Sequence, residues 1–418
     1  MISSTIRPPQ RPSAAGDVHF LTWKDAMLMK KTVTLLLLLA LLAALLVGCG
    51  GAETEAPAPE TTPEETAPQE TPVPAEEGEA LETAQFDYDN AQAAHSPETV
   101  VMTVGDTPVN WTKYEGALAQ LVYELNAYYG ISDLSEALEE GVTVTDWALD
   151  WAENYMAQLA LLHSKAAEQG LSLTEDELAE IDADIQEQAD AYFDGDVDAL
   201  FAEMHVPEEL YRYQAEAALY YDKLFVSVFG EMGANLSEED AVAYVADQGY
   251  LNAKHILWLF TDEAGEELSD ADKDARRAEA AQVLETLREA SEEQREELFD
   301  SLMAQYSQDP GSANFPDGYY FQTGDMVQPF EDAAASLAAG ELSELVESDY
   351  GVHLLYRPAM RADHIFSYDS ENQPYTLRYM AADGLFANMM DEWLAEQEIV
   401  YAEGFEHLDL AGLFAYAA

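Results

Sequence analysis

Two histidines lie in segments whose apolar and polar residues alternate as they do in strands. His255 falls in a predicted strand over residues 252–260, and His353 falls in a predicted strand over residues 352–357. His255 shares a strand face with Ala253 and Leu257, and His353 shares a face with Leu355, so two hydrogen-bonding imidazoles are built into apolar strands. Taken singly, each is more typical of a structural core histidine than of a functional one, and both interpretations stay open on this pattern alone.

The segments around these histidines predict a small α+β domain. Strand-like and helix-like patterns follow in the order strand, helix, strand, helix, strand, with the first helical stretch split in two. A turn at Asp309-Pro310-Gly311-Ser312 ends that stretch. The predicted strands cover 252–260, 317–322 and 352–357, and the predicted helices cover 269–290, 292–306 and 329–337.

Five short motifs run through this region, and together they resemble the signature motifs of the parvulin family of peptidylprolyl isomerases. They are Lys254-His255-Ile256-Leu257, Tyr306-Ser307-Gln308-Asp309-Pro310-Gly311-Ser312, Gly324-Asp325-Met326-Val327-Gln328-Pro329-Phe330-Glu331, Gly340-Glu341-Leu342-Ser343 and Tyr350-Gly351-Val352-His353. Five motifs in the family's order are a specific signal, and the region covers about a quarter of the chain. The resemblance implies a parvulin-like small sheet with surrounding helices.

The resemblance also implies which residues act. The family's catalytic positions fall on His255, Asp309 and His353. Its substrate-binding positions fall on Leu257, Met326, Phe330 and Tyr350. We expect no cofactor and no metal at this site.

Rotation of an X-Pro amide breaks no bond, but the C–N bond must lose its double-bond character against a barrier of about 18–20 kcal/mol. We expect a dry pocket made by Met326 and Phe330 to disfavour the planar, charge-separated amide. Hydrogen bonds among His255, His353 and Asp309 would then stabilise the twisted amide. In this hypothesis Asp309 tunes the polarity of the site and is not a nucleophile.

The chain departs from the family pattern in two places. Residues 314–321 stand where many relatives have Gly-Gly-Asp-Leu-Gly, so Gly318 replaces the usual pocket leucine, and we expect Tyr319 or Tyr320 to fill the space. The loop over residues 261–267 is acidic where phosphate-selective parvulins are basic. A preference for a phosphorylated residue before proline is therefore not expected.

An export signal precedes these regions. Met29-Lys30-Lys31 is a basic start, and residues 35–47 form an apolar run that is short for a membrane span. The run ends in Leu46-Val47-Gly48-Cys49-Gly50, which resembles the lipobox at which bacterial lipoproteins are lipidated on the cysteine and cleaved before it. The alternative is an uncleaved helix with a chance cysteine. The lipobox predicts an extracytoplasmic protein anchored to the bacterial cell membrane by lipid on Cys49. Because Cys49 is the only cysteine in the sequence, the chain has no disulfide framework.

The arrangement of the chain loosely resembles that of PrsA-type foldase lipoproteins and SurA-type chaperones. We expect an upstream extension with a signal peptide, a disordered Glu/Thr/Pro/Ala-rich tether, an N-terminal helical chaperone domain, an inserted parvulin domain, and a C-terminal helical segment that packs on the N-terminal domain. These parts cover residues 1–48, 49–96, 97–250, 251–358 and 359–418 respectively.

Local signals predict individual elements of the N-terminal region. Residues 100–109 alternate as in a hairpin, and Thr112 and Thr174 each start a capping-box pattern. Pro207 is predicted as the first residue of a helix that ends near Gly230. That helix carries more apolar surface than one partner helix covers, which fits either packing within the domain or a groove for unfolded chains.

The charge balance excludes one class of function. The chain has 18 Lys and Arg against 82 Asp and Glu, and its formal net charge is -64. A field of that sign repels nucleic-acid phosphates and attracts basic or unfolded polycationic partners. We therefore expect no nucleic-acid binding, and partners that are unfolded or partly folded exported proteins with X-Pro bonds.

Three functions compete at this point. The first is a prolyl isomerase and foldase, and the second is a holdase whose parvulin domain is weakly active or inactive. The third, a solute-binding lipoprotein, would need repeated βαβ units in two lobes, which the pattern does not contain. No set of histidines and carboxylates has metal-ligand spacing, although weak calcium binding by acidic clusters stays open, as do the clients and the oligomeric state.

Overall fold

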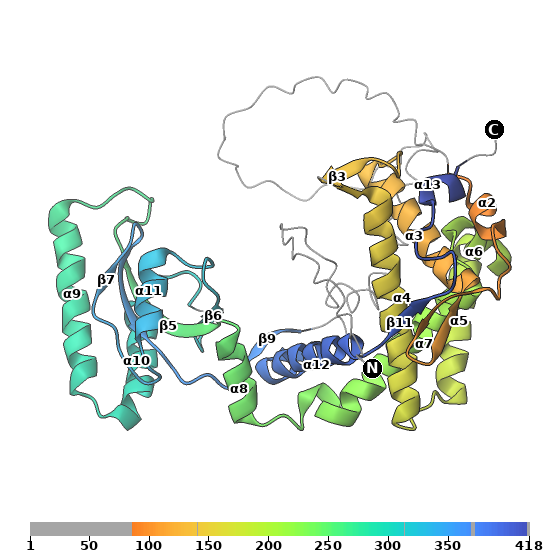
Figure 1. Cartoon of the computed structure of the whole chain (residues 1–418). Coiled ribbons are helices and arrows are strands. Elements are labelled where there is room, and N and C mark those ends of the chain that lie inside the picture. The colour runs from red at the N-terminus through yellow and green to blue at the C-terminus, as the bar shows by residue number, and fades with distance from the viewer. Residues whose placement is uncertain (1–85, 140, 313, 369–372, 416–418) are drawn as a thin grey trace, which may run out of the picture. The chain divides into compact units, whose positions relative to one another are not determined.

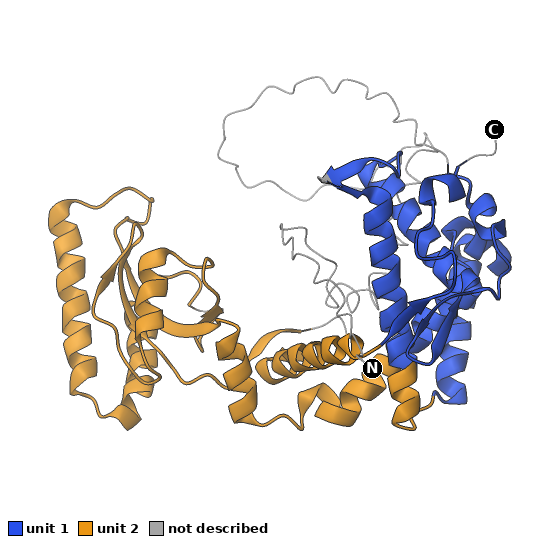
Figure 2. Cartoon of the chain, viewed as in Figure 1, with its two compact units in different colours: residues 1–163, 173–219, 398–418 blue, residues 164–172, 220–397 orange. Residues whose placement is uncertain are grey.

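A computed structural model describes residues 86–139, 141–312, 314–368 and 373–415. The expected signal peptide, the lipidation residue Cys49 and the tether up to residue 85 lie outside the described residues. The chain divides into two compact units (Figure 2): unit 1 holds residues 1–163, 173–219 and 398–418, and unit 2 holds residues 164–172 and 220–397. The five domains expected from the sequence remain a prediction.

Unit 1 is mainly helical and contains a small antiparallel sheet in the order β11-β1-β2. The hairpin predicted over residues 100–109 is confirmed by β1 and β2, and β11, from near the end of the chain, pairs with the other edge of β1. Its elements are α2 (Tyr88–Ala93), β1 (Val100–Val104), β2 (Thr107–Asn110), α3 (Trp111–Tyr129), β3 (Ala137–Glu139), β4 (Val142–Thr143), α4 (Val144–Glu168), α5 (Glu175–Tyr192), α6 (Val197–Met204), α7 (Glu208–Phe229), β11 (Ile399–Tyr401) and α13 (Leu410–Leu413), and the C-terminal parts of α4 and α7 belong to unit 2.

The capping box predicted at Thr112 is wrong. Helix α3 begins at Trp111, and its N-cap is Asn110, whose side chain accepts a hydrogen bond from the Lys113 N–H at 3.1 Å. Asn110 ends β2 with an extended backbone, and its short amide side chain reaches the free N–H groups of the first turn. Glu115 is instead buried within unit 1, and burial raises its pKa to about 8.

Two other predicted helix starts hold to within one residue. Thr174 and Glu177 form the predicted capping box at the start of α5. Helix α7 begins at Glu208, one residue after the predicted position, because Pro207 acts as the cap and its carbonyl accepts from the N–H groups of the first turn. The chain leaves α7 at Gly230, whose φ of 72° favours glycine.

Unit 2 contains the predicted α+β domain (Figure 1). The predicted order of strands and helices is confirmed, and the structure adds a short edge strand, β7, that the sequence pattern did not indicate. The elements of unit 2 are η1 (Glu231–Gly233), α8 (Glu238–Asp247), β5 (Leu251–Leu259), α9 (Asp270–Glu289), α10 (Glu292–Tyr306), β6 (Tyr319–Phe321), α11 (Gln328–Ser336), β7 (Val346–Glu347), β8 (Gly351–Tyr356), β9 (Ile365–Tyr368), β10 (Pro374–Thr376) and α12 (Leu377–Ala395).

The central sheet of unit 2 has four antiparallel strands in the order β6-β5-β8-β7. In the pairing of β5 with β8, His255 lies opposite Leu355, and Leu257 lies opposite His353. Directly opposed residues point to the same face of a sheet, so both histidines share one face as diagonal neighbours. The register therefore places side chains 98 positions apart in the sequence next to each other.

The two faces of this sheet are covered differently. One face, with Ile256 and Trp258, packs against α9 and α10 around the buried Phe299. The other face, with Ala253 and Leu355, packs against α11 around the buried Phe330 (Figure 1). The histidines belong to the second face, beside the smaller of these two apolar clusters. The larger cluster holds the sheet in place without contributing to the site.

Replacing Phe299 by alanine should lower the free energy of unfolding of this sheet by about 3–5 kcal/mol, because the substitution leaves a cavity in the larger cluster. Native-state hydrogen exchange of the β5 and β8 amides measures the change. Phe315, which is 49% exposed, gives the matched control, and Phe315→Ala should change that free energy by less than about 1 kcal/mol. Equal losses in the two variants would contradict this assignment of the core.

Candidate active site

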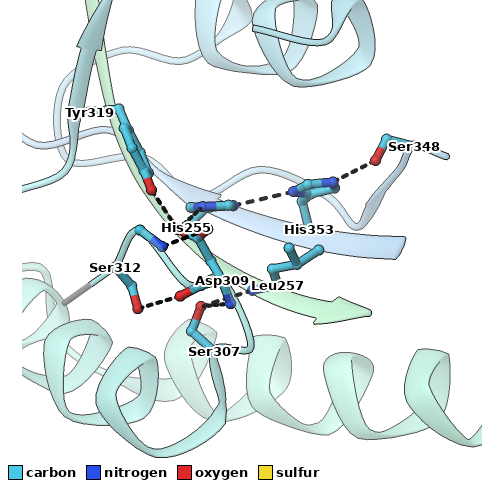
Figure 3. A network of polar contacts seen from close by, with 9 residues as sticks. His255, Leu257, Ser307, Asp309, Ser312, Tyr319, Ser348 and His353 are labelled. Atoms are coloured by element: carbon cyan, nitrogen blue, oxygen red, sulfur yellow. Dashed lines mark hydrogen bonds and ion pairs between the residues drawn. The ribbon is translucent and has the colours of Figure 1, made fainter. Parts of the chain in front are cut away.

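The two histidines form a buried pair on the β5 and β8 strands. The Nδ1 atoms of His255 and His353 lie 3.2 Å apart, and the two rings are nearly parallel, at 14° (Figure 3). Both side chains are buried. A contact between two ring nitrogens needs one donor and one acceptor, so the two Nδ1 atoms share a single proton.

Asp309 lies at the outer end of this pair, in the loop after α10. Its Oδ2 atom is 3.0 Å from His255 Nε2 and accepts a hydrogen bond from the Tyr319 hydroxyl at 2.6 Å. Its Oδ1 atom accepts from the Gly311 N–H at 3.2 Å. Burial alone would raise the pKa of Asp309, but the hydrogen bonds from His255, Tyr319 and Gly311 outweigh burial and lower it to about 2. Asp309 is therefore a carboxylate at neutral pH.

Ser348 lies at the other end, where its Oγ atom is 2.7 Å from His353 Nε2. The Ser348 Oγ atom also accepts a hydrogen bond from the Tyr350 N–H at 3.2 Å, which leaves its own proton free to donate to the imidazole. Burial and the neighbouring His255 lower the pKa of His353 to about 4, against the opposing effect of Asp309. His353 is thus neutral at pH 7.

These contacts form one row of hydrogen bonds from Ser348 through His353 and His255 to Asp309, and they fix the direction of each bond. An ionised Asp309 only accepts hydrogen bonds, so His255 Nε2 donates to it. In a neutral His255 the Nδ1 atom then accepts from His353 Nδ1, and His353 Nε2 accepts from the Ser348 hydroxyl. Every donor in the row points toward Asp309. The arrangement is an oriented chain of dipoles that ends on the partly buried negative charge of Asp309.

The loop that carries Asp309 is attached to the free edge of β5. Strand β6 pairs only with the start of β5, at residues 251–253, and leaves the rest of that edge without a strand partner. The Gln308 N–H donates to the Leu257 carbonyl at 2.8 Å, and the Ser307 Oγ atom accepts from the Leu257 N–H at 3.3 Å. Leu259 N–H donates to the Gln308 side chain at 3.0 Å. These bonds fix the position of Asp309 relative to His255.

An apolar wall stands over the histidines. Phe330, from α11, lies edge-on to His255 with ring centroids 5.1 Å apart, and edge-on to His353 at 5.8 Å. Met326 packs in the same apolar cluster. A wall of this kind excludes water beside the row of hydrogen bonds, which strengthens their electrostatic effect on a bound group.

The structure brings most of the predicted site residues together. His255, Asp309 and His353 form one network, with Phe330 against it and Met326 in the adjoining cluster. Leu257 is buried on the same face of β5 as His255. The side chain of Tyr350 is 59% exposed, and the residue reaches the network only through its backbone N–H. The catalytic and substrate-binding roles of these residues remain predictions.

Two residues of the network, Ser307 and Ser348, were not predicted, and Tyr319 was predicted only as one of two tyrosines that could fill the space beside Gly318. The alternation of side chains along β6 distinguishes the two tyrosines. Tyr319 pairs with Ala253 and so lies on the same face of the sheet as His255. Tyr320 lies on the opposite face and stacks on His364. The space left by the missing pocket leucine is thus approached by Tyr319 and not by Tyr320. Ser307 and Ser348 have no such signal, since a serine in a loop is ordinarily a turn residue.

Gly318 cannot be exchanged for a leucine in this fold. Its φ is 90°, and a Cβ atom there would lie 2.7 Å from the Ala253 carbonyl oxygen. The close approach allows β6 to pair with β5 from its first residue, Tyr319.

Among the residues that the structure describes, no group of three or more His, Cys, Asp or Glu side chains could hold a metal ion.

Comparison with known proteins places this site in a family domain. Residues 255–359 match the family model described as Rotamase: PPIC-type PPIASE domain. The foldase protein PrsA of Geobacillus sp. (strain WCH70) is 52% identical over 60 residues, which are 14% of this chain and 22% of the relative. The peptidyl-prolyl cis-trans isomerase pin1 of Rhizopus delemar is 41% identical over 64 residues, which are 15% of this chain and 43% of that protein.

A solved structure is similar over a longer stretch. The crystal structure of PrsA from Bacillus subtilis is 18% identical, covers 63% of this chain and 92% of its own, and has a TM-score of 0.22. In sequence, this chain spans about a fifth of the length of the curated PrsA relatives it matches.

Nitrogen NMR of the His353 ring should show a neutral imidazole down to about pH 4, because burial and His255 disfavour its charged form. The unfolded chain takes up this proton near pH 6.5, so the contribution of His353 to the free energy of unfolding is present above pH 6.5 and is lost as pH falls toward 4. Comparison with His353→Gln assigns the resonance. A titration midpoint near 6.5 would contradict the buried, hydrogen-bonded position.

Proposed function

We propose that this chain, whose residues 255–359 match the PPIC-type rotamase domain, is a peptidylprolyl cis-trans isomerase and foldase for exported proteins. The observation that carries the proposal is the continuous row of contacts from Asp309 through His255 and His353 to Ser348, beside the apolar ring of Phe330. A row of this kind supplies polarity without a nucleophile, which is what rotation about an amide bond requires.

In the proposed mechanism the prolyl ring lies against Phe330 and Met326. The planar amide is stabilised by charge separation between its oxygen and nitrogen, and a dry apolar wall supports that charge separation less well than water does. The twisted amide carries less charge on oxygen and a localised lone pair on nitrogen, and the fixed dipoles of the row favour this charge distribution over that of the planar amide. Asp309 takes part by orienting His255, since its carboxylate oxygens already accept three hydrogen bonds.

The acidic loop after β5 supports the expected lack of phosphate selectivity. Its Asp262 side chain accepts hydrogen bonds from the Ala264 and Glu266 N–H groups, so this carboxylate stabilises the turn itself. Glu267 pairs with Lys273 of α9. With no basic residue in positions 261–267 and a net charge of -64, clients with basic segments near proline suit this protein better than phosphorylated ones.

The location is proposed from the sequence. The lipobox-like motif at Cys49 supports lipid anchoring at the outer face of the bacterial cell membrane, with residues 49–96 as a tether, 97–250 and 359–418 as a helical chaperone domain, and 251–358 as the inserted parvulin domain. In the part of the chain that the structure describes, no helix is both long and apolar enough to cross a membrane.

A second candidate function, a chaperone with a weakly active or inactive parvulin domain, is favoured by apolar side chains on unit 1. Tyr128 and Tyr129 at the end of α3 are 53% and 75% exposed, and Leu138 of β3 is also exposed. Exposed aromatic side chains of this kind can hold unfolded segments without any chemistry.

A proline-isomerisation assay on residues 50–418 tests the enzyme directly, with a peptide series that varies the residue before proline. His255→Ala and His353→Ala should each lower kcat/KM about 10²-fold, because each removes a link of the polar row. Asp309→Ala should lower it about tenfold through misorientation of His255.

His364→Ala is the matched control, because His364 stacks on Tyr320 outside the network, and its kcat/KM should stay within about twofold of the unchanged chain. Full activity in Asp309→Ala would remove Asp309 from the mechanism. An inactive wild type that still suppresses aggregation of an unfolded client would establish the chaperone in place of the enzyme.

Replacing Cys49 by alanine should abolish lipid attachment and move the protein from the membrane fraction to the soluble fraction, because Cys49 is the only thiol that could be lipidated. Labelling with a radioactive fatty acid in a bacterial host, followed by fractionation, measures both effects. Gly50→Ala, next to the cysteine, is the control and should keep the label. An unlabelled wild-type protein would overturn the proposed anchor.

A further inference from the structure

Tyr319 contacts the hydrogen-bond network at Asp309, the residue that carries the negative charge. Its hydroxyl donates to Asp309 Oδ2 at 2.6 Å, the same oxygen that lies 3.0 Å from His255 Nε2 (Figure 3). Burial, and then the adjacent Asp309 carboxylate, raise the pKa of Tyr319 far above its ordinary value, so the phenol keeps its proton and remains a donor. Two donors from two different strands thus meet on one carboxylate oxygen.

The chain makes room for this hydroxyl. A Cβ atom on Gly311 would lie 1.9 Å from the Tyr319 hydroxyl oxygen, so only glycine at that position allows the contact. Gly318, just before Tyr319, lets the backbone of this segment lie close to the Ala253 carbonyl, and this fixes the position of the Tyr319 Cα atom. The contact therefore depends on two glycines from separate segments.

We propose that Tyr319 is a positioning residue, whose hydroxyl holds the Asp309 carboxylate ionised and directed at His255 Nε2. The inference rests on the proposed isomerase function and deepens it, because it assigns to this chain a fixed orientation of the polar row. At the position where the family pattern has a pocket leucine, this chain has Gly318. The next residue, Tyr319, adds a hydrogen bond to the Asp309 carboxylate.

The groups that face Asp309 set the direction of the effect. They are His255 from β5, Tyr319 from β6 and the Gly311 N–H of its own loop, with His353 of β8 behind His255. Loss of the Tyr319 hydroxyl leaves the partly buried carboxylate of Asp309 with two donors instead of three. Its pKa then rises, because a hydrogen bond to the charged form has been removed while burial persists.

A purely structural role for Tyr319 would lie in its ring, which packs 4.8 Å from the ring of Phe315. Tyr319→Phe separates the two roles, since it keeps the ring and removes only the hydroxyl. Gly311→Ala reaches the same contact from the other side by displacing the hydroxyl. Tyr320→Phe, on the opposite face of β6, is the matched control.

The first measurement is the titration of the Asp309 carboxyl carbon by NMR in the full chain, with Asp309→Asn for assignment. Tyr319→Phe and Gly311→Ala should raise the titration midpoint by about one pH unit, a tenfold change in the ionisation constant, while Tyr320→Phe leaves it unchanged. A midpoint in Tyr319→Phe equal to that of the wild type would overturn the proposal, as would an equal shift in Tyr320→Phe.

The second measurement determines kcat and KM for proline isomerisation at pH 7 separately. In Tyr319→Phe, kcat should fall several-fold with KM nearly unchanged, because His255 is less firmly oriented while the apolar wall is intact. A kcat in Tyr319→Phe equal to that of the wild type would overturn the positioning role. A wild type without isomerase activity would defeat the proposed function itself, and the NMR titration would then still decide whether the hydroxyl holds Asp309.

Discussion

The antiparallel pairing of β5 with β8 is the constraint on which the site depends. A shift of one residue in this register would turn either His255 or His353 to the other face of the sheet, into the cluster around Phe299. The observed register instead makes the histidines diagonal neighbours and leaves 3.2 Å between their Nδ1 atoms. The large apolar cluster on the far face supplies the energy that holds this register, so the packing and the chemistry lie on opposite sides of one sheet.

The charge at the end of the polar row is stabilised locally. The chain as a whole is strongly anionic, and partial burial of the Asp309 carboxylate by itself favours its neutral form. Three hydrogen bonds to Asp309 reverse that tendency. Because Asp309 then only accepts hydrogen bonds, it determines which nitrogen of each histidine carries the proton. A single short-range cluster of donors thus controls the direction of a row that extends across two strands to Ser348.

The departure from the family pattern near β6 has a coherent physical account. Gly318 lies too close to the Ala253 carbonyl for any side chain, so a leucine is excluded by the backbone and not by the pocket. The next residue, Tyr319, places its hydroxyl where Gly311 leaves room. The apolar wall over the histidines is then made chiefly by Phe330. Where the family pattern has an apolar leucine, this site has the hydrogen bond from Tyr319 to Asp309, and the order of the sequence motifs is unchanged.

The sequence by itself determined the identity and order of the elements around the site. Alternation and helical spacing are local properties, so the strands with His255 and His353 and the helices between them could be predicted to within a few residues. The resemblance to parvulins also pointed to Asp309 and Phe330. Only the tertiary structure decided the rest. The contacts of Tyr319 and Ser348 join residues whose partners lie on other segments, and no local pattern encodes which hydroxyl will meet which acceptor. The N-cap at Asn110 was missed for a related reason, because its role depends on where β2 ends, and the pairing of β2 with β1 decides that.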